Sequence, residues 1–425
     1  MKTMTALALV LASASAAHAA GSLSNESFID QIGTANHANV SQTNGSNGQG
    51  TFQAGSKNTA NTGQLSNLPT GQNSSGTVQV GKKNMATTLQ TNSPPNSQDT
   101  TAAVTNNSFT AQFGNLNTSM AIQAGGQNGQ GTLQVGKKNM ATTDQTGTGV
   151  ALPNSGSNPA LGGPSLGAVN TSFTGQFGEN NQATTSQLTA DTSTKGSFQT
   201  GSANTSASLQ IGDGNIATTD QNASGGQKGT ASPLPGAINL SAAVQVGNKN
   251  TATTLQSGGA FSVSRPTFAD TVAAEANASF TGQIGNLNQA TVAQVNGGNG
   301  QATFQVGTSN MATIVQQNAG GGSATNGALT AQIGTKNQAT VAQTVATPLA
   351  AGASNSFINQ VGNSNIVNAA QVTGPQAMIG ANTQVTMQVG SGNIATIGQT
   401  TGANVTNTSF TAQMGHGNTA VVSQH

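Results

Sequence analysis

The residue types that this sequence lacks already exclude several classes of fold. It has no Cys, Trp or Tyr, and its aromatic residues, 13 Phe, make up only 3% of 425 residues. Charged residues are 5% and hydrophobic residues 34% of the chain, whereas ordinary globular domains have about 25% and about 45–50%. This composition cannot build a core of large side chains, which disfavours most soluble enzyme folds. The absence of Cys excludes disulfides, so stability must have another source.

Net charge is also scarce, because 11 basic residues oppose 10 acidic ones. Disordered chains usually combine low hydrophobicity with high net charge, so simple disorder is not favoured. The chain is rich in Asn, Gln, Ser and Thr, and it has 56 Gly. Low charge with abundant Gln and Asn is typical of segments that pair backbone to backbone and stack their side-chain amides.

The N-terminus predicts export. Lys2 gives a basic start, an Ala, Leu and Val region follows to Ala16, and Ala17-His18-Ala19 is a small-x-small cleavage site. We therefore expect residues 1–19 to be a signal peptide, residues 20–26 a short N-terminal segment, and the mature protein to be extracellular. A membrane anchor needs about 20 apolar residues, and this run is too short. Without Lys2, ten basic and ten acidic residues leave a net charge of 0.

One pattern, Gln-x-Gly-x-x-Asn-x-Ala-x-x-x-Gln, recurs fifteen times. With the first Gln as position 0, Gly at +2, Asn at +5 and Gln at +11 are present in every copy, and Ala at +7 in twelve. Such repetition indicates a repeat architecture and not separate domains. The first Gln of each copy is Gln31, Gln53, Gln79, Gln112, Gln134, Gln176, Gln199, Gln210, Gln245, Gln283, Gln305, Gln332, Gln360, Gln388 and Gln413.

A finer period of 11 residues lies inside the repeat, as in the series Gln112, Gln123, Gln134 and Gln145. Eleven residues hold one strand and a tight turn, so 22 residues make one rung of a two-sided β-solenoid. We predict an all-β, parallel two-sheet β-solenoid of about fifteen strand-turn-strand repeats over residues 27–425. Gly and Asn both tolerate left-handed backbone angles, so we expect each to do so in the turn. The turn glycines that we single out are Gly33, Gly114, Gly136, Gly285 and Gly415.

Proline placement agrees with this strand assignment. All eleven prolines lie outside the repeats, as expected of a residue that cannot donate to a strand ladder. The segments that hold most of them are rich in Gly, Ser, Asn and Pro, and we expect flexible insertions between rungs. The longest are Thr91–Asn107, Thr146–Thr171, Asn222–Leu240 and Ser257–Ala278.

Alternation places Gln at 0, Asn at +5, Ala at +7 and Gln at +11 on one face of the rung. We expect this face to be the interior, where identical amides stack along the axis and hydrogen-bond from rung to rung. Solvent exposure of these amides is the alternative, but solvent does not enforce identity at a fixed period. The predicted stacking ladder comprises Gln31, Asn36, Gln42, Gln112, Asn117, Gln123, Gln134, Asn139, Gln145, Gln283, Asn288, Gln294, Gln413, Asn418 and Gln424.

The opposite face carries an apolar stripe. Position +1 is Ile, Val, Phe or Met in thirteen copies, and a Phe at −3 joins it in six. An exposed stripe of this length marks an interaction surface, so we expect it to promote lateral packing of solenoids. The reverse assignment, in which the apolar stripe is the core, stays open from the sequence.

These repeats resemble those of curlin, the subunit of bacterial curli fibres, and they cover nearly all of the chain from Ser27 to Gln424. The resemblance implies a β-solenoid that polymerises end to end into extracellular functional amyloid for adhesion, aggregation and biofilm. It also implies export through an outer-membrane curli secretion pore and assembly on a nucleator subunit. The array is longer than the usual subunit, and the Ser that the family has at −6 is often Asn here, as at Asn25, Asn106, Asn170, Asn277 and Asn407.

Other chemistry is sparse. His37, His416 and His425 match no metal spacing, and no set of nucleophile, base and orienting residue stands out, so we expect no enzymatic activity, metal or cofactor. Asp144, Glu179, Asp213 and Asp220 are either gatekeepers against premature aggregation or ordinary surface charge. Seven lysines lie between the Gly and Asn of a turn, where they favour solubility or, alternatively, attract matrix polyanions. These are Lys57, Lys82, Lys83, Lys137, Lys138, Lys249 and Lys336.

Two further functions compete with fibre formation. An ice-binding solenoid needs a flat face of paired Thr columns, and Thr recurs at +8 in nine copies while +6 is mixed. One column does not make such a plane. A tethered surface adhesin needs an anchor segment, which we do not find after residue 19.

Overall fold

The computed structural model describes residues 25–67, 71–92, 105–148, 169–190, 202–224, 237–258, 276–318, 325–345, 351–374, 379–401 and 405–425. The chain divides into two compact units, Met1–Asp213 and Gly214–His425, called the first and the second unit below. The predicted signal peptide, residues 1–19, and all eleven prolines lie outside the described residues.

The described residues form strands joined by short turns. The strands of the first unit are β1 (Asn25–Thr34), β2 (His37–Thr43), β3 (Ser46–Ser56), β4 (Thr59–Ser66), β5 (Gln72–Lys82), β6 (Met85–Asn92), β7 (Thr105–Asn115), β8 (Thr118–Ala124), β9 (Gln127–Lys137), β10 (Met140–Thr148), β11 (Val169–Glu179), β12 (Gln182–Ala190) and β13 (Ala203–Ile211). Those of the second unit are β14 (Ile216–Ser224), β15 (Ile238–Asn248), β16 (Thr251–Gly258), β17 (Ala276–Asn286), β18 (Gln289–Val295), β19 (Asn299–Thr308), β20 (Met311–Asn318), β21 (Thr325–Thr335), β22 (Gln338–Val345), β23 (Ala351–Asn363), β24 (Ile366–Thr373), β25 (Ile379–Ser391), β26 (Ile394–Thr401), β27 (Thr406–His416) and β28 (Thr419–Gln424).

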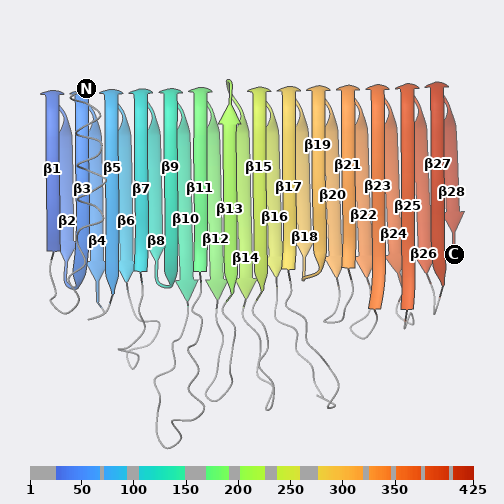
Figure 1. The fold of residues 1–425 in the computed structure, drawn as a ribbon, viewed down its shortest axis with the longest axis horizontal. Helices are drawn as coiled ribbons and strands as arrows, with labels where there is room; N and C mark the ends of the chain where they lie inside the picture. The colour runs from blue at the N-terminus through green and yellow to red at the C-terminus, as the bar shows by residue number, and fades with distance from the viewer. Residues whose placement is uncertain are drawn as a thin grey trace, which may run out of the picture. The chain divides into compact units, whose positions relative to one another are not determined.

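Within each unit the odd-numbered strands form one parallel sheet and the even-numbered strands form the other, in chain order (Figure 1). The register aligns the repeats residue for residue, so that Gln31 pairs with Gln53 and Gly33 with Gly55. The same holds in the second unit, where Gln283 pairs with Gln305. The predicted parallel two-sheet β-solenoid is therefore confirmed.

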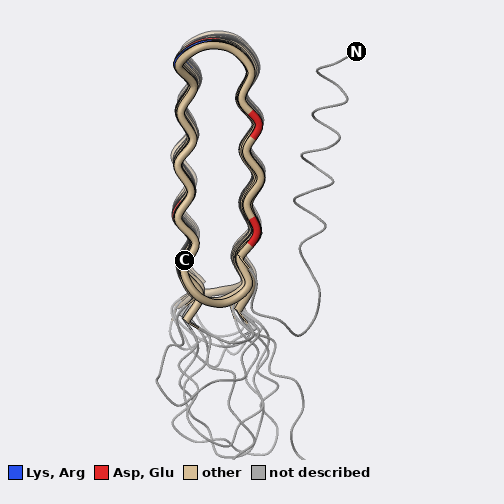
Figure 2. The backbone as a smooth tube through the Cα atoms, turned by 90° about the vertical axis from the view of Figure 1, so that its left-hand side faces the viewer, with Lys and Arg blue, Asp and Glu red and all other residues tan. Residues whose placement is uncertain are grey.

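Each rung is a narrow flattened loop, in which a tight turn joins an odd-numbered strand to the next even-numbered one (Figure 2). Fourteen of the fifteen copies of the pattern supply one such pair of strands. The copy that begins at Gln199 is the exception. Gln199 lies outside the described residues. Asn204 of that copy lies on β13, where it pairs with Asn170 of β11, and β13 already belongs to the copy that begins at Gln210. The 11-residue period explains the extra match, because half a rung can imitate the pattern of a whole one.

The gaps between the described ranges all fall between an even-numbered strand and the following odd-numbered strand. The turn from an odd-numbered to an even-numbered strand is never interrupted. The central parts of the four long predicted insertions lie in these gaps, outside the described residues.

The interior is mostly polar. Side chains at −6, −4, −2 and 0 on the odd-numbered strands, and at +5, +7, +9 and +11 on the turn and even-numbered strands, are buried in most rungs. Apolar residues fill the space between the amides in the second unit, where Ile314, Val341, Ile358 and Ile397 form one buried cluster with the Ala residues at +7. The apolar residues at +1 point outward, which decides the orientation that the sequence left open.

Candidate functional site

The first Gln of each rung forms a hydrogen-bonded column. In the first unit, Nε2 of each Gln donates to Oε1 of the Gln one rung further along the chain, at 2.6–2.8 Å from Gln31 to Gln210. In the second unit the same bonds run from Gln245 to Gln413 at 2.7–3.0 Å. Most of these side chains are fully buried, so every amide would be costly if it lacked its neighbour.

Each of these amides also links the two sheets. Nε2 of Gln134 donates to the main-chain oxygen of Thr118 on β8 at 2.9 Å, besides its bond to Gln176. Gln305 does the same with the main-chain oxygen of Gln289 at 2.9 Å. A Gln side chain is long enough to reach the opposite sheet, and its two N–H groups serve both bonds.

The Gln at +11 builds a second column on the even-numbered strands. Its bonds run from Gln42 to Gln187 in the first unit at 2.7–2.9 Å. In the second unit they run from Gln221 to Gln424 at 2.7–2.8 Å. Its second N–H crosses to the odd-numbered strand of the same rung, as from Gln145 to the main-chain oxygen of Gly129. Two amide columns therefore fasten the sheets together from both sides.

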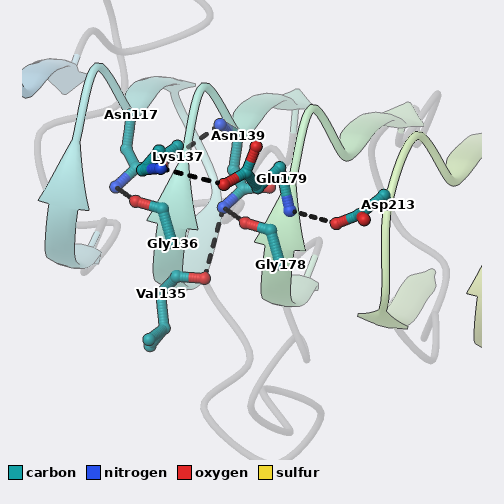
Figure 3. Close-up of polar contacts among 8 residues, drawn as sticks. All are labelled: Asn117, Val135, Gly136, Lys137, Asn139, Gly178, Glu179 and Asp213. Carbon is teal, nitrogen blue, oxygen red and sulfur yellow. Dashed lines mark hydrogen bonds and ion pairs between the residues drawn. The ribbon is translucent and has the colours of Figure 1, made fainter.

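The Asn at +5 closes the turn. Nδ2 of Asn139 donates to the main-chain oxygen of Val135 at 3.3 Å and to that of Gly178 in the next rung at 2.9 Å (Figure 3). Its Oδ1 accepts the main-chain N–H of Asn181 at 3.1 Å. One side chain thus satisfies polar groups of its own turn and of the following turn.

The Gly at +2 is required by close packing between turns. Gly136 has a φ of +128°, and a Cβ on it would lie 1.9 Å from the main-chain oxygen of Gly178. Gly33, Gly114 and Gly285 have the same contact with the Gly of the next rung, at 1.9–2.0 Å. Gly415 shares the positive φ, +107°. Any other residue would force adjacent turns apart.

The prediction that the Asn at +5 adopts a left-handed backbone angle is wrong. The left-handed residue of the turn, besides Gly, is the one at +4, which is Lys57, Lys138, Leu116 or another residue at φ of 54–61° in all rungs that lack Gly there. Asn is present because of its amide hydrogen bonds, not because of its backbone angle. The variable residue at +4 tolerates αL strain because the surrounding ladder determines the turn.

A third amide column was not predicted. The Asn at −6 donates from Nδ2 to Oδ1 of the Asn one rung earlier, from Asn47 to Asn25 at 2.7 Å and onward to Asn204. Its donors point in the direction opposite to that of the Gln columns. The signal was in the sequence, since Asn occurs at −6 in nearly every rung, although it stood out only as a departure from the curlin pattern.

The turn edge of the first unit carries opposite charges. Lys137 Nζ lies 3.2 Å from Glu179 Oε1, and the main-chain N–H of Glu179 donates to Asp213 Oδ1 at 2.8 Å (Figure 3). Both partners of the ion pair are at least half exposed, so the pair contributes little to stability. Within the described ranges no three His, Asp or Glu residues gather in a metal-binding group.

Within each unit, the structure brings the predicted ladder residues together in columns that run from rung to rung. The central members, Gln112, Asn117, Gln134, Asn139, Gln283 and Asn288, are fully buried. Gln31, Asn36 and Gln42 lie in the β1–β2 rung, and Gln413, Asn418 and Gln424 in the β27–β28 rung, where only one neighbouring rung covers them. Gln31 and Asn418 are accordingly exposed.

No protein-family model matches the chain, and a search of curated proteins finds no significant match. Among the residues that the structure describes, no helix is both long and apolar enough to cross a membrane.

Proposed function

We propose that this protein is a secreted structural subunit that assembles end to end into extracellular, curli-like amyloid fibres, which serve adhesion, cell aggregation and the biofilm matrix. The observation that carries the proposal is the polarity of the amide columns. Every Gln column donates in one direction along the chain, and every column continues to the last rung that is described at either end.

The two end rungs are complementary. Within the described residues, Oε1 of Gln31 and of Gln42 accepts no hydrogen bond, while Gln413 and Gln424 each use one Nε2 hydrogen on a main-chain oxygen and retain a second. Stacking β27–β28 of one copy on β1–β2 of another would therefore extend both Gln columns. The Asn at −6 fits as well, because Asn25 has a spare donor where Asn407 has a spare acceptor.

Such a contact is heterologous and does not close on itself, so it propagates into a filament. The exposed strand edges of β1 and β27 supply main-chain hydrogen bonds at the same time. The resemblance of the repeats to curlin supports the same function, and with it a nucleator subunit and an outer-membrane secretion pore as partners. The absence of a catalytic constellation in the repeats favours a structural role over an enzymatic one.

The test is assembly of the purified protein, followed by thioflavin T fluorescence and fibre diffraction. We expect fibres with a meridional reflection at about 4.7–4.8 Å. In the double variant Gln413→Glu/Gln424→Glu, each new carboxylate faces a Gln Oε1 acceptor in the stacked state, and we expect a lag time at least about tenfold longer, since burying an unpaired charge is costly.

The matched control is Met414→Glu/Val421→Glu, which adds the same charge to the same rung on side chains that are 78% and 74% exposed. It should assemble with a lag close to that of the unmodified protein. A protein that stays monomeric for days, or a Gln413→Glu/Gln424→Glu variant that assembles as fast as its control, would contradict the proposal.

A further inference from the structure

The outer face of the odd-numbered sheet in the second unit is uncharged and mostly apolar, with Asn355, Asn359, Thr383 and Thr408 as its polar members. It is formed by the residues at −5, −3, −1 and +1 of β15 to β27, none of which is Lys, Arg, Asp or Glu. Ile284, Ile333 and Phe304 on this face are 54%, 48% and 45% exposed. We call these positions the odd face.

The opposite outer face of the same unit is different. Its centre is a column of Thr at +8, in which Thr253 pairs with Thr291, Thr291 with Thr313 and Thr313 with Thr340. Gln289 and Gln338 lie beside this column at +6. This face also has exposed apolar residues, among them Leu255, Met311 and Val315. The Thr and Gln beside them keep it more hydrated than the odd face, so the odd face gains more from being covered.

The odd face has a ridge and a hollow on β17 and β19. The rings of Phe280 and Phe304 lie 5.2 Å apart and lean over Gly282, where a Cβ would meet both rings at 3.2–3.3 Å. Next to this ridge, Gly300 and Ala302 leave the surface low, and a Cβ on Gly300 would meet nothing closer than 4.0 Å. A partner surface must match this ridge and this hollow, which lie on neighbouring strands about 4.8 Å apart.

We propose that the odd face of the second unit pairs with the odd face of a second copy of this chain. A second copy is the surface that carries the same strand spacing, and a twofold arrangement places the ridge of one copy beside the hollow of the other. The seven strands span about 29 Å, and four outward positions span about 20 Å. The contact would bury about 600 Å² per copy, or about 1,200 Å² in all, which is the lower limit of stable interfaces.

This pairing is lateral, so it is separate from the end-to-end stacking proposed above. The test therefore uses the Gln413→Glu/Gln424→Glu variant, in which stacking is suppressed, and measures mass by sedimentation velocity. We expect a dimer, twice the mass of a single chain. Adding Ile284→Lys and Ile333→Lys should halve that mass, because two charges would be buried in the interface.

The control places the same charges in the same rungs on the opposite face, as Thr291→Lys and Thr340→Lys. This variant should remain dimeric, and circular dichroism should show unchanged β-structure in all variants. A monomer with an intact odd face, a dimer that survives Ile284→Lys/Ile333→Lys, or a loss of dimer in the Thr291→Lys/Thr340→Lys control would overturn the proposal.

Wild-type fibres give a second readout that does not need the stacking variant. The mass per length of fibres should correspond to two solenoids side by side, and it should halve in Ile284→Lys/Ile333→Lys without loss of the 4.7–4.8 Å reflection. If no fibres form, the end-to-end proposal fails while the sedimentation result still decides the lateral one. Equal mass per length in fibres of the unmodified protein and of Ile284→Lys/Ile333→Lys would reject the pairing.

Discussion

At the scale of single residues, the Gln columns work because one amide meets three demands. Gln134 receives a bond from Gln112, donates one to Gln176 and donates another to the main chain of Thr118. Leu has a similar size but satisfies none of these, and Asn is too short to reach the same three partners from the same backbone position. Every rung therefore needs Gln at position 0, because another residue there would remove one hydrogen bond from the Gln before it and one from the Gln after it.

The change Gln134→Leu should accordingly lower the free energy of unfolding by about 2–6 kcal/mol, because it leaves two buried polar groups unpaired at about 1–3 kcal/mol each. Denaturant unfolding of the protein, followed by circular dichroism, measures this. Lys137→Gln, three residues away on the exposed turn, is the control and should cost less than about 1 kcal/mol. Equal effects of the two changes would show that the column is not a main source of stability.

Two glycines of the same strand, β9, differ in the space around them. Gly136→Ala places a Cβ 1.9 Å from the main-chain oxygen of Gly178, so we expect a loss of at least about 3 kcal/mol or a failure to fold. Gly129→Ala, also on β9, meets nothing within 4 Å and has no positive φ. That change should be neutral or stabilising by up to about 1 kcal/mol in thermal unfolding. Similar melting temperatures for the two variants would disprove the close-packing explanation.

At the scale of elements, the two connections of each rung differ in whether their length can change. The two Gln of one repeat are always 11 residues apart, whereas successive Gln in a column are separated by 22 residues between Gln112 and Gln134 and by 42 between Gln134 and Gln176. The turn from an odd-numbered to an even-numbered strand contains the Asn at +5, whose hydrogen bonds join adjacent turns, and so this turn cannot change length. The Asn column at −6 follows the return connection and continues across returns of different length, from Asn128 to Asn106 and from Asn170 to Asn128. The return connection could therefore be lengthened without breaking a column.

Inserting Gly-Ser between Gly125 and Gly126, in the short return from β8 to β9, should therefore cost about 1 kcal/mol or less. The same insertion between Lys137 and Lys138 removes Asn139 from its bonds to Val135 and Gly178, and we expect a loss of at least about 3 kcal/mol. Urea unfolding of the two variants compares them directly. The opposite order of stabilities would mean that the turns do not set the rung.

At the scale of the whole molecule, the near absence of charge removes long-range repulsion between copies. Since Lys, Arg, Asp and Glu nearly balance, the rate of assembly should change less than about threefold between 20 and 500 mM NaCl, because there is little for salt to screen. Thioflavin T kinetics measure this rate. Thr308→Lys/Thr335→Lys, which places like charges in adjacent turns beside Lys336, is the control and should assemble slowly at low salt and faster at high salt. A strong salt dependence of the unmodified protein would contradict this account.

Much of this arrangement follows from the repeat itself. The strand-turn-strand rung, the parallel stacking and the two Gln columns are all predictable, because a pattern with invariant spacing permits only one alignment of neighbouring rungs. Three features were missed for physical reasons. The Asn at −6 lies outside the twelve-residue pattern, the αL residue at +4 has no fixed identity, and the copy at Gln199 matches the pattern through the 11-residue period without forming a rung of its own.

The sequence alone determined that this chain is a stack of near-identical rungs without a conventional core, since its lack of large, charged and disulfide-forming residues leaves amide stacking as the remaining means of cohesion. It could not decide which face is inside, because Gln, Asn and Ala on one side and Ile, Val and Phe on the other are each compatible with a packed layer. Only the tertiary structure decided this. Gln reaches across the narrow interior to the opposite sheet and satisfies main-chain groups there, which no apolar side chain can do, and the hydrophobic stripe is therefore left on the surface.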